Sequence, residues 1–425
     1  MRDPVVVVGG SLAGLRCVEQ LRLHGWTGSI TVIGEEPYAP YNRPPLSKDA
    51  LTRWSSNSPG RWAEIVALRT RAGVTDVSWR LGVSATRVDV EHQLVHLDDG
   101  DPIKFCGLVV ATGVRPRRIS LPGPTTGRHV LRTLDDARAL APRLFDGQRV
   151  VVLGAGFVGC EVAATAAAIG CRVTLVEPGP APLARVLGCE IGAAVGNYQQ
   201  SKGVRIRCGR TAVAMVPARS GGRVAAVALD DGTEVPADVV IEAVGSVPNV
   251  EWLDNIGIDI TDGILCDRNL RAGGRPNIVA AGDIARVANP RFDDIPRRIE
   301  HWCMPAATAR QAAASLASHL TRNSLAPASF APLPTFWSDQ FELRLQSFGQ
   351  PFLGDAAHLV DGTLDRLQDG AIVHYTRAER LVGVVMTNIP ANQQRVHRGL
   401  VDSACPAPEP DLATSQHSGA PIDQP

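Results

Sequence analysis

The sequence predicts an α/β protein with two Rossmann-like domains and a smaller α+β domain at its C-terminal end. The chain has 425 residues, which is more than one hydrophobic core usually holds. An apolar run, a glycine-rich turn, a helical pattern and a second apolar run follow one another twice in the chain. From about residue 330, segments of alternating apolar and polar residues predict a further sheet.

The first repeated unit begins at the N-terminus. Residues 4–8 read Pro-Val-Val-Val-Val, an apolar run typical of a buried parallel strand, and Gly9, Ser11 and Gly14 follow it. A helical pattern comes next, and the apolar run at 30–33 leads to Glu35. In such a unit the N–H groups at the helix start bind a pyrophosphate, and the acid binds a ribose. Since Ser11 replaces the usual middle glycine, we expect a slightly less close approach to the phosphate.

The second unit carries all three glycines of the pattern. Residues 149–153 are followed by Gly154, Gly156 and Gly159, then by an alanine-rich helix and a strand that ends at Glu177. Two complete units predict two bound dinucleotides. A carboxylate at Glu177 suits a free 2′-hydroxyl and repels a 2′-phosphate, which favours NADH over NADPH. Arg185, close by in sequence, leaves NADPH open.

Composition and charge exclude several other classes of protein. The chain has 43 basic and 43 acidic residues, so no net charge indicates nucleic acid or an anionic membrane. No apolar run approaches the roughly 20 residues that span a bilayer. The nine cysteines include no C-x-x-C pair, which argues against a disulfide framework or a metal site and predicts reduced thiols in the cytoplasm.

Three further apolar strands end in small-residue turns, at residues 108–113, 240–249 and 277–283. In this order, after two glycine turns, they resemble the flavoprotein reductases related to glutathione reductase, which bind two dinucleotides. The resemblance implies FAD in the first domain, and it implies that Asp283 hydrogen-bonds the ribityl and phosphate region of the flavin.

Three longer strings make the resemblance more specific. They are Pro-Tyr-Ala-Pro-Tyr-Asn-Arg-Pro-Pro-Leu-Ser-Lys at 37–48, Glu-His-Trp at 300–302 and Thr-Phe-Trp-Ser-Asp-Gln at 335–340. With them, residues 3–400 resemble the FAD-dependent ferredoxin reductases of oxygenase and cytochrome P450 systems, the type of putidaredoxin and rhodocoxin reductases. This resemblance implies an NADH-dependent ferredoxin–NAD(+) reductase, which passes single electrons from FAD to a [2Fe–2S] ferredoxin that feeds a cytochrome P450 or an oxygenase. It also implies a monomer or weak homodimer.

The string at 37–48 excludes a neighbouring class. Disulfide reductases carry a redox-active cysteine pair after the first unit, whereas this chain has no cysteine between Cys17 and Cys106. Electrons therefore leave the flavin directly or through another protein.

The resemblance also implies roles for single residues. It places Lys48 at the reactive edge of the flavin, Trp302 and Trp337 beside the ring system as a shield and electron exit, and Glu161 at the nicotinamide end. Residues 303–306 read Cys-Met-Pro-Ala, where relatives have Asn-Ala after the tryptophan, and this puts a polar contact to the flavin's pyrimidine end in doubt. The cofactor-binding residues expected from the two turns and the resemblance are Gly9, Ser11, Ala13, Gly14, Glu35, Arg43, Lys48, Val83, Ala111, Thr112, Gly113, Gly154, Gly156, Phe157, Val158, Gly159, Glu177, Arg185, Gly245, Gly282, Asp283 and Trp302.

The expected domain organisation is discontinuous. We predict an FAD-binding domain at 1–115 and 242–321, an NAD-binding domain at 116–241, a C-terminal interface domain at 322–403 and a disordered tail at 404–425. Because ferredoxins are acidic, we also expect a basic docking patch. Its candidates are Arg291, Arg297, Arg298, Arg344 and Arg377.

Two alternatives remain open. The electron acceptor could be a rubredoxin or an oxygenase component, which changes the partner and keeps the chemistry. Alternatively, the chain could resemble apoptosis-inducing factor, in which NADH binding controls assembly. Rapid NADH-dependent reduction of a ferredoxin separates the latter possibility from a reductase.

Overall fold

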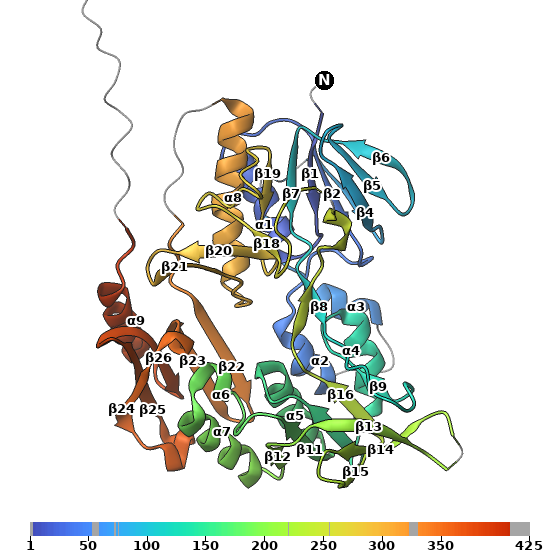
Figure 1. Cartoon of the computed structure of the whole chain (residues 1–425), viewed down its shortest axis with the longest axis vertical. Coiled ribbons are helices and arrows are strands. Elements are labelled where there is room, and N and C mark those ends of the chain that lie inside the picture. Colours follow the sequence, from blue (N-terminus) through green and yellow to red (C-terminus); the bar gives the residue numbers. More distant parts are fainter. Residues whose placement is uncertain are drawn as a thin grey trace, which may run out of the picture.

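The repeated units form two separate five-stranded parallel sheets in the computed structural model of the chain (Figure 1). The structure describes residues 3–52, 59–71, 74, 76–219, 221–254, 256–322 and 330–408. The two sheets lie at opposite ends of the view, and a third, antiparallel sheet lies beside the second one. The α/β class and the two Rossmann-like domains predicted from the sequence are confirmed.

The first sheet has the strand order β19-β7-β1-β2-β3. Its central strand consists of four valines that are almost fully buried, because neighbouring strands flank it and the helices α1 and α8 pack together beside the sheet. The elements are β1 (Val5–Val8), α1 (Leu12–Leu23), β2 (Ile30–Gly34), β3 (Val77–Leu81), β7 (Gly107–Val110), β19 (Ile278–Ala280) and α8 (Met304–Thr321).

The second sheet repeats this arrangement, with the order β12-β11-β10-β16-β9. Again the strand before the glycine turn is central, and the strand after the helix lies next to it. Its elements are β9 (Arg128–His129), α4 (Leu134–Leu140), η2 (Ala141–Arg143), β10 (Arg149–Leu153), α5 (Phe157–Ile169), β11 (Arg172–Glu177), α6 (Ala184–Leu187), α7 (Cys189–Ser201), β12 (Arg205–Cys208) and β16 (Val239–Glu242).

Small sheets that are mostly antiparallel extend both units, and two strands run between the units. The connections between the units pair with each other as β8 (Val114–Pro116) and β17 (Ser246–Pro248). β16 runs through Glu242, so the second connection begins a few residues after the expected boundary. The remaining elements are β4 (Ala85–Asp89), β5 (Leu94–Leu97), β6 (Gly100–Lys104), β13 (Ala212–Pro217), β14 (Val224–Leu229), β15 (Glu234–Pro236), η3 (Glu251–Leu253), β18 (Ile264–Leu265), β20 (Ala285–Asn289) and β21 (Asp293–Arg297).

The segment between β2 and β3 belongs to the first unit in sequence, but its apolar side chains pack against the second unit. Between β2 and β3 the chain forms η1 (Pro44–Ser47), α2 (Asp49–Thr52) and α3 (Pro59–Ile65). Leu46, Leu51 and Trp62 belong to the hydrophobic core of the second sheet, beside α4 and α5, and not to the core of the first sheet. Residues 41–51 and 62–66 thus connect the expected FAD-binding region to the expected NAD-binding region (Figure 1).

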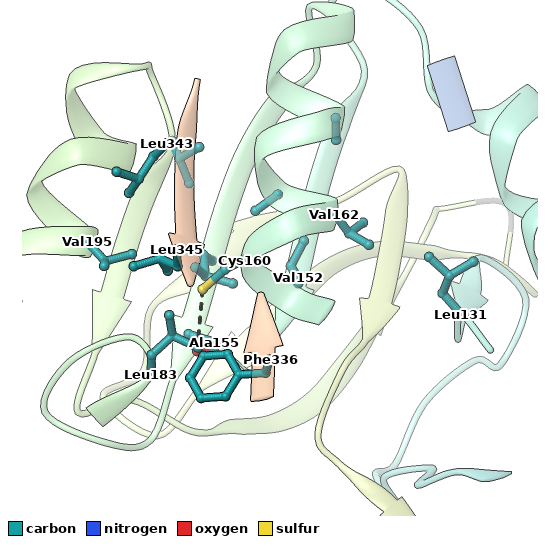
Figure 2. Close-up of a cluster of buried hydrophobic side chains, with 14 of the residues drawn as sticks. Leu131, Val152, Ala155, Cys160, Val162, Leu183, Val195, Phe336, Leu343 and Leu345 are labelled. Atoms are coloured by element: carbon teal, nitrogen blue, oxygen red, sulfur yellow. Dashed lines mark hydrogen bonds between the residues drawn. The ribbon is translucent and has the colours of Figure 1, made fainter. Parts of the chain in front are cut away.

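The C-terminal sheet shares a core with the second unit. Its strand order is β22-β23-β26-β25-β24. Figure 2 shows Phe336, Leu343 and Leu345 of this sheet beside Cys160 and Val195 of the second unit. The elements are β22 (Thr335–Gln340), β23 (Leu343–Gly349), η4 (Pro351–Leu353), β24 (Ala356–Gly362), η5 (Leu364–Asp369), β25 (Ala371–Arg377), β26 (Arg380–Thr387) and α9 (Ala391–Ala404).

The ordered chain continues slightly past the predicted start of the tail. Cys405 is buried, and its carbonyl accepts a hydrogen bond from Arg291 at 2.5 Å. Residues 404 and 405 therefore belong to the end of α9, which packs on the C-terminal sheet, while 409–425 lie outside the described residues. Among the residues described, no helix combines the length and apolarity needed to cross a membrane.

Candidate functional site

One cavity of about 290 Å³ lies where the first unit, the second unit and the C-terminal sheet meet. Residues of the first glycine turn and of the helix after the second turn line the same space. The sequence-predicted residues on its wall are Ser11, Ala13, Arg43, Lys48, Ala111, Thr112, Gly113, Phe157, Val158, Glu161, Gly282, Asp283, Trp302 and Trp337.

The first turn depends on two glycines for close backbone contact. Gly9 has φ +125°, and a Cβ there would lie 2.1 Å from the carbonyl oxygen of Ala111. A Cβ on Gly14 would lie 2.0 Å from the carbonyl oxygen of Gly9. Only glycine permits this approach of strand, turn and helix. As a result, the start of α1 and the end of β7 border the cavity together.

The second turn has the same backbone contacts. Gly154 has φ +94°, with the carbonyl oxygen of Ala243 2.5 Å from a Cβ position, and a Cβ on Gly159 would lie 2.0 Å from the carbonyl oxygen of Gly154. Around Gly156, by contrast, nothing lies within 4 Å of a Cβ. That open space leaves room for a ligand directly against the backbone at the start of α5.

The two acids after the turns differ in their surroundings. Glu177 Oε2 accepts a hydrogen bond from the N–H of Ala155 at 2.7 Å, and Oε1 accepts one from the N–H of Gly179 at 2.8 Å. Its carboxylate is therefore fixed beside the second turn. Glu35 is exposed at the end of β2.

Arg43 is held by a partner that sequence analysis missed. Its guanidinium donates to Glu36 at 2.6 Å, to the Tyr41 hydroxyl at 3.0 Å and to the carbonyl of Arg132 at 2.6 Å. Burial opposes the charge on Arg43, but the neighbouring oxygens of Tyr41 and Glu36 outweigh it and raise its pKa. Arg43 thus presents a fixed positive charge at the wall of the cavity.

Lys48 forms an ion pair with Glu161 across the two units. Lys48 Nζ lies 2.6 Å from Glu161 Oε2, and the Ser47 hydroxyl donates to the same oxygen at 2.6 Å. On the other side of the carboxylate, the Ser338 hydroxyl donates to Oε1 at 2.9 Å. Lys48 lies on the chain just after η1, Glu161 on α5 and Ser338 on β22, so all three regions meet at one buried carboxylate.

The two predicted tryptophans lie against each other at the mouth of the cavity. The ring centroids of Trp302 and Trp337 are 5.6 Å apart, with the planes inclined at 69°. Trp302 is 43% exposed, and its indole N–H donates to Asn42 Oδ1 at 2.8 Å. Asn42 was not predicted as a site residue, although it lies within the string at 37–48 that carries the resemblance.

His301 and Arg132 are two further wall residues that sequence analysis did not select. Arg132 donates to Asp283 at 2.8 Å. The His301 ring packs on Phe336, with centroids 5.1 Å apart, and burial lowers its pKa to about 4, opposed by the charge of Asp283. His301 adjoins Trp302 in the string Glu-His-Trp, which was the available signal, whereas Arg132 lies in no segment that the motifs selected.

The unusual turn at residues 303–306 forms the start of α8. The N–H of Met304 donates to the carbonyl of His301 at 2.9 Å, and Pro305, which lines the cavity, has no N–H. The Cys303 thiol donates to the backbone carbonyl of Thr335 at 3.3 Å. Neither Met304 nor Pro305 therefore has a free N–H at the start of this helix.

The other predicted site residues lie outside the cavity. Gly9 and Gly14 form the first turn, Gly154, Gly156 and Gly159 form the second, and Glu177 lies beside the second. Val83 donates its N–H to the carbonyl of Gly34 at the end of β2. Arg185 is exposed on α6, and Gly245 lies next to the connection β17.

In the structure, each arginine of the predicted basic patch has an acidic neighbour. The side chain of Arg291 is 11% exposed and bonds Asp402 at 2.7 Å. Arg298 is equally buried between Asp262 and Glu300. Arg297 and Arg377 share Asp293, and Arg344 lies 3.7 Å from Asp339. These side chains join segments of the fold and offer no unpaired cluster of positive charge.

The wall of the cavity suits a flavin and the second turn suits a nicotinamide dinucleotide. Among the described residues, His301 Nδ1 and Arg132 Nε are buried without a hydrogen-bond partner on the protein. Buried polar atoms of this kind are expected where a polar ligand completes the site. If FAD binds here, the first glycine turn, Asp283 and Lys48 would be the residues beside its phosphates, ribityl chain and ring, and Gly156 and Glu177 would be those beside the phosphate and ribose of NADH.

Comparison with protein families and curated proteins gives a consistent result. Residues 3–313 match the family described as pyridine nucleotide-disulphide oxidoreductase, and residues 335–418 match the family described as reductase C-terminal. The chain is 37% identical to the ferredoxin–NAD(+) reductase component of the anthranilate 1,2-dioxygenase system of Burkholderia cepacia, over 82% of each chain. It is 34% identical to rhodocoxin reductase of Rhodococcus erythropolis, over 95% of this chain and 91% of the relative.

A solved structure with the same fold covers nearly the whole chain. The covalent putidaredoxin reductase–putidaredoxin complex contains a chain with 31% sequence identity and a TM-score of 0.84, covering 94% of this chain and 93% of that one.

Proposed function

The chain belongs to the pyridine nucleotide-disulphide oxidoreductase family, and from this premise we propose that it is an NADH-dependent, FAD-containing ferredoxin reductase. Its electron acceptor is a [2Fe–2S] ferredoxin that feeds an oxygenase or a cytochrome P450 in the cytoplasm. Relatives named as ferredoxin reductases of dioxygenase systems and as rhodocoxin reductase support this assignment. A monomer or weak homodimer suffices for this activity.

One observation carries the proposal: the first glycine turn and the helix after the second turn line a single cavity. Ser11 and Ala13 come from the first turn, and Phe157 and Glu161 come from α5. A dinucleotide on each turn would bring its reactive end to the same place. This arrangement supports direct transfer between NADH and FAD without an internal disulfide.

The flavin, when bound, supplies the redox chemistry, because it accepts a hydride from NADH and releases electrons singly to a one-electron carrier. The protein binds and orients the reactants. The two glycine turns bind the pyrophosphates, Asp283 and Arg132 form the wall beside the first turn, and Lys48 places a compact positive charge in the cavity. Trp302 and Trp337 cover the mouth and exclude water.

Anaerobic stopped-flow mixing tests the proposal. We expect NADH to bleach the flavin absorbance rapidly and NADPH to do so slowly, and we expect a [2Fe–2S] ferredoxin to reoxidise the reduced protein. Equal rates with both nucleotides would contradict the role given to Glu177. Rapid bleaching with transfer only to a rubredoxin or an oxygenase component would change the partner. A stable NADH complex that changes the oligomeric state and passes electrons to no ferredoxin would overturn the reductase assignment.

A further inference from the structure

A line of buried polar side chains leads from the cavity into the C-terminal sheet. Along β22 the inward-facing residues are Phe336, Ser338 and Gln340, and they face α5 and α7. The Gln340 amide donates to the Ser338 hydroxyl at 3.2 Å, and Gln199 of α7 donates to the Gln340 carbonyl oxygen at 2.7 Å. Ser338, Gln340 and Gln199 are all fully buried.

Polar side chains are uncommon at such fully buried positions. A buried amide must replace its hydrogen bonds to water, and apolar side chains of similar size commonly pack there at no loss of stability. Gln199 Oε1 even lacks a hydrogen-bond partner among the described residues. The neighbouring positions of the same core are apolar, including Phe336, Leu343 and Leu345 (Figure 2). The polar residues therefore call for an explanation other than packing.

The line ends on Glu161, whose two oxygens each have two donors. Oε2 accepts from Lys48 and from the Ser47 hydroxyl, both at 2.6 Å. Oε1 accepts from the Ser338 hydroxyl at 2.9 Å and from the N–H of Asp339 at 3.4 Å. A carboxylate offers about four acceptor sites, so the protein occupies all of them. The orientation of the carboxylate, and with it that of the Lys48 ammonium, is fixed from two sides.

We propose that Ser338, supported by Gln340 and Gln199, is a positioning residue that holds Glu161 and thereby Lys48 in the geometry needed at the meeting point of the two cofactor sites. The proposal rests on the proposed function and extends it, because it gives the C-terminal sheet a part in the reaction with NADH. Ser338 supplies the shorter of the two bonds to Oε1. Without it the carboxylate can rotate, and the Lys48 ammonium follows its partner.

The replacement Ser338→Ala tests this role, and the chain offers a matched control. Ser347 lies on the adjacent strand β23, is also fully buried, and its hydroxyl has no partner among the described residues. Ser347→Ala removes the same atom from the same core without touching Glu161. Both variants are purified with their flavin, and FAD content and thermal unfolding are compared first.

We expect Ser338→Ala to keep its FAD and to lower the limiting rate of flavin reduction by NADH about tenfold, because small displacements of an oriented group cost this much or more. The apparent NADH dissociation constant should change less than the rate. The flavin midpoint potential should shift, since the positive charge of Lys48 moves relative to the ring. Ser347→Ala should behave as the wild type in all of these measurements.

A second replacement acts further along the line. Gln340→Met keeps the volume of the side chain and removes the amide that supports Ser338, so it should slow reduction about threefold, less than Ser338→Ala does. Ser338→Thr keeps a hydroxyl at the same position and should restore most of the rate.

The outcomes are distinguishable. If Ser338→Ala matches Ser347→Ala in rate and in potential, the positioning role is wrong. If Ser338→Ala loses FAD or unfolds, and Gln340→Met leaves the rate unchanged, the line is structural and the proposal is also overturned. If NADH fails to reduce the wild type, the proposed function fails. In that case the flavin potential, measured with a chemical reductant in Ser338→Ala and Ser347→Ala, still decides the positioning role.

Discussion

The two glycine turns of the molecule are nearly superimposable in their backbone contacts, yet their surroundings differ. Gly14 and Gly159 each approach a carbonyl oxygen at 2.0 Å from their Cβ positions. The first sheet has its own hydrophobic core with α1 and α8, whereas the second shares a core with the C-terminal sheet and with residues 41–51 and 62–66. The comparison teaches that similar local sequences form turns of similar backbone geometry. The surroundings of each turn, in contrast, are determined by segments distant in sequence.

Replacing Gly14 or Gly159, the last glycine of each turn, should have the largest effect. Gly14→Ala places a Cβ against the carbonyl oxygen of Gly9, so we expect loss of FAD and a decrease in unfolding free energy of at least about 3 kcal/mol. Gly159→Ala makes the same clash in the second unit, so it should abolish NADH binding while FAD is retained. Flavin absorbance and NADH titration check both. Gly399→Ala on α9, where nothing lies within 4 Å, serves as the control. Loss of FAD from both turn variants alike would contradict separate roles.

The second-largest effect concerns how stability depends on pH, which should differ between His301 at the cavity and His129 in the second sheet. Burial lowers the pKa of His301 to about 4 from its ordinary value of 6.5, so the folded protein keeps it neutral while the unfolded chain takes up a proton. Stability should therefore fall as the pH decreases from 6.5 to 4, by about 2–3 kcal/mol from this group. His301→Asn should remove that part of the slope in denaturant unfolding.

His129, on β9 of the second sheet, provides the matched comparison. Its pKa is also lowered by burial and by Arg143, Arg118 and Arg223, but it is only partly buried. His129→Asn should flatten the slope less than His301→Asn does, and an equal effect would mean that the cavity does not desolvate His301 more strongly.

Replacing the acids that follow the turns, Glu177 and Glu35, should affect activity with NADH and with NADPH differently. Glu177→Ala removes a carboxylate held by two backbone N–H groups, and we expect kcat/KM for NADH to fall about ten- to hundredfold with a smaller change for NADPH. Glu35→Ala should weaken FAD retention and leave the ratio of NADH to NADPH activity unchanged. Steady-state kinetics with both nucleotides checks the pair. A changed ratio in Glu35→Ala would mean that the turns are not specialised as assigned.

The smallest effects should come from exchanging the middle residues of the turns. Gly156 has φ −73°, and a Cβ there meets nothing within 4 Å, so Gly156→Ser should fold normally. We expect it to raise the NADH dissociation constant by less than about tenfold, because only the approach of the phosphate is affected. Ser11→Gly should change FAD affinity by less than about threefold. Isothermal titration of both variants sharpens the comparison, and unfolding of Gly156→Ser would contradict it.

Local patterns were sufficient to predict the repeated units, because strand, turn and helix are determined by residues close together in sequence. The resemblance implied that Lys48, Asp283, Trp302 and Trp337 lie at the flavin, and the structure brings all four to one cavity. What depends on distant partners was not predictable. The arginines of the supposed docking patch look alike in sequence, and only the fold pairs Arg291 with Asp402 across more than a hundred residues. The packing of Leu46, Leu51 and Trp62 on the second sheet, and the hydrogen bond from Ser338 to Glu161, depend in the same way on tertiary contacts.

The shared core of the second unit and the C-terminal sheet has a consequence for building chimeric reductases. If the C-terminal sheet were removed, Phe336, Leu343 and Leu345 would be lost with it, and Cys160 and Val195 of the second unit would lose their cover (Figure 2). If the C-terminal sheet of a relative were grafted onto this chain, its apolar side chains would have to pack against Cys160, Val195 and the other core residues of this second unit. The exchangeable module includes the second unit together with the C-terminal sheet. Its recombination points belong in the paired connections β8 and β17 and in the chain between α8 and β22, and the module must also match Leu46, Leu51 and Trp62, which pack in the same core.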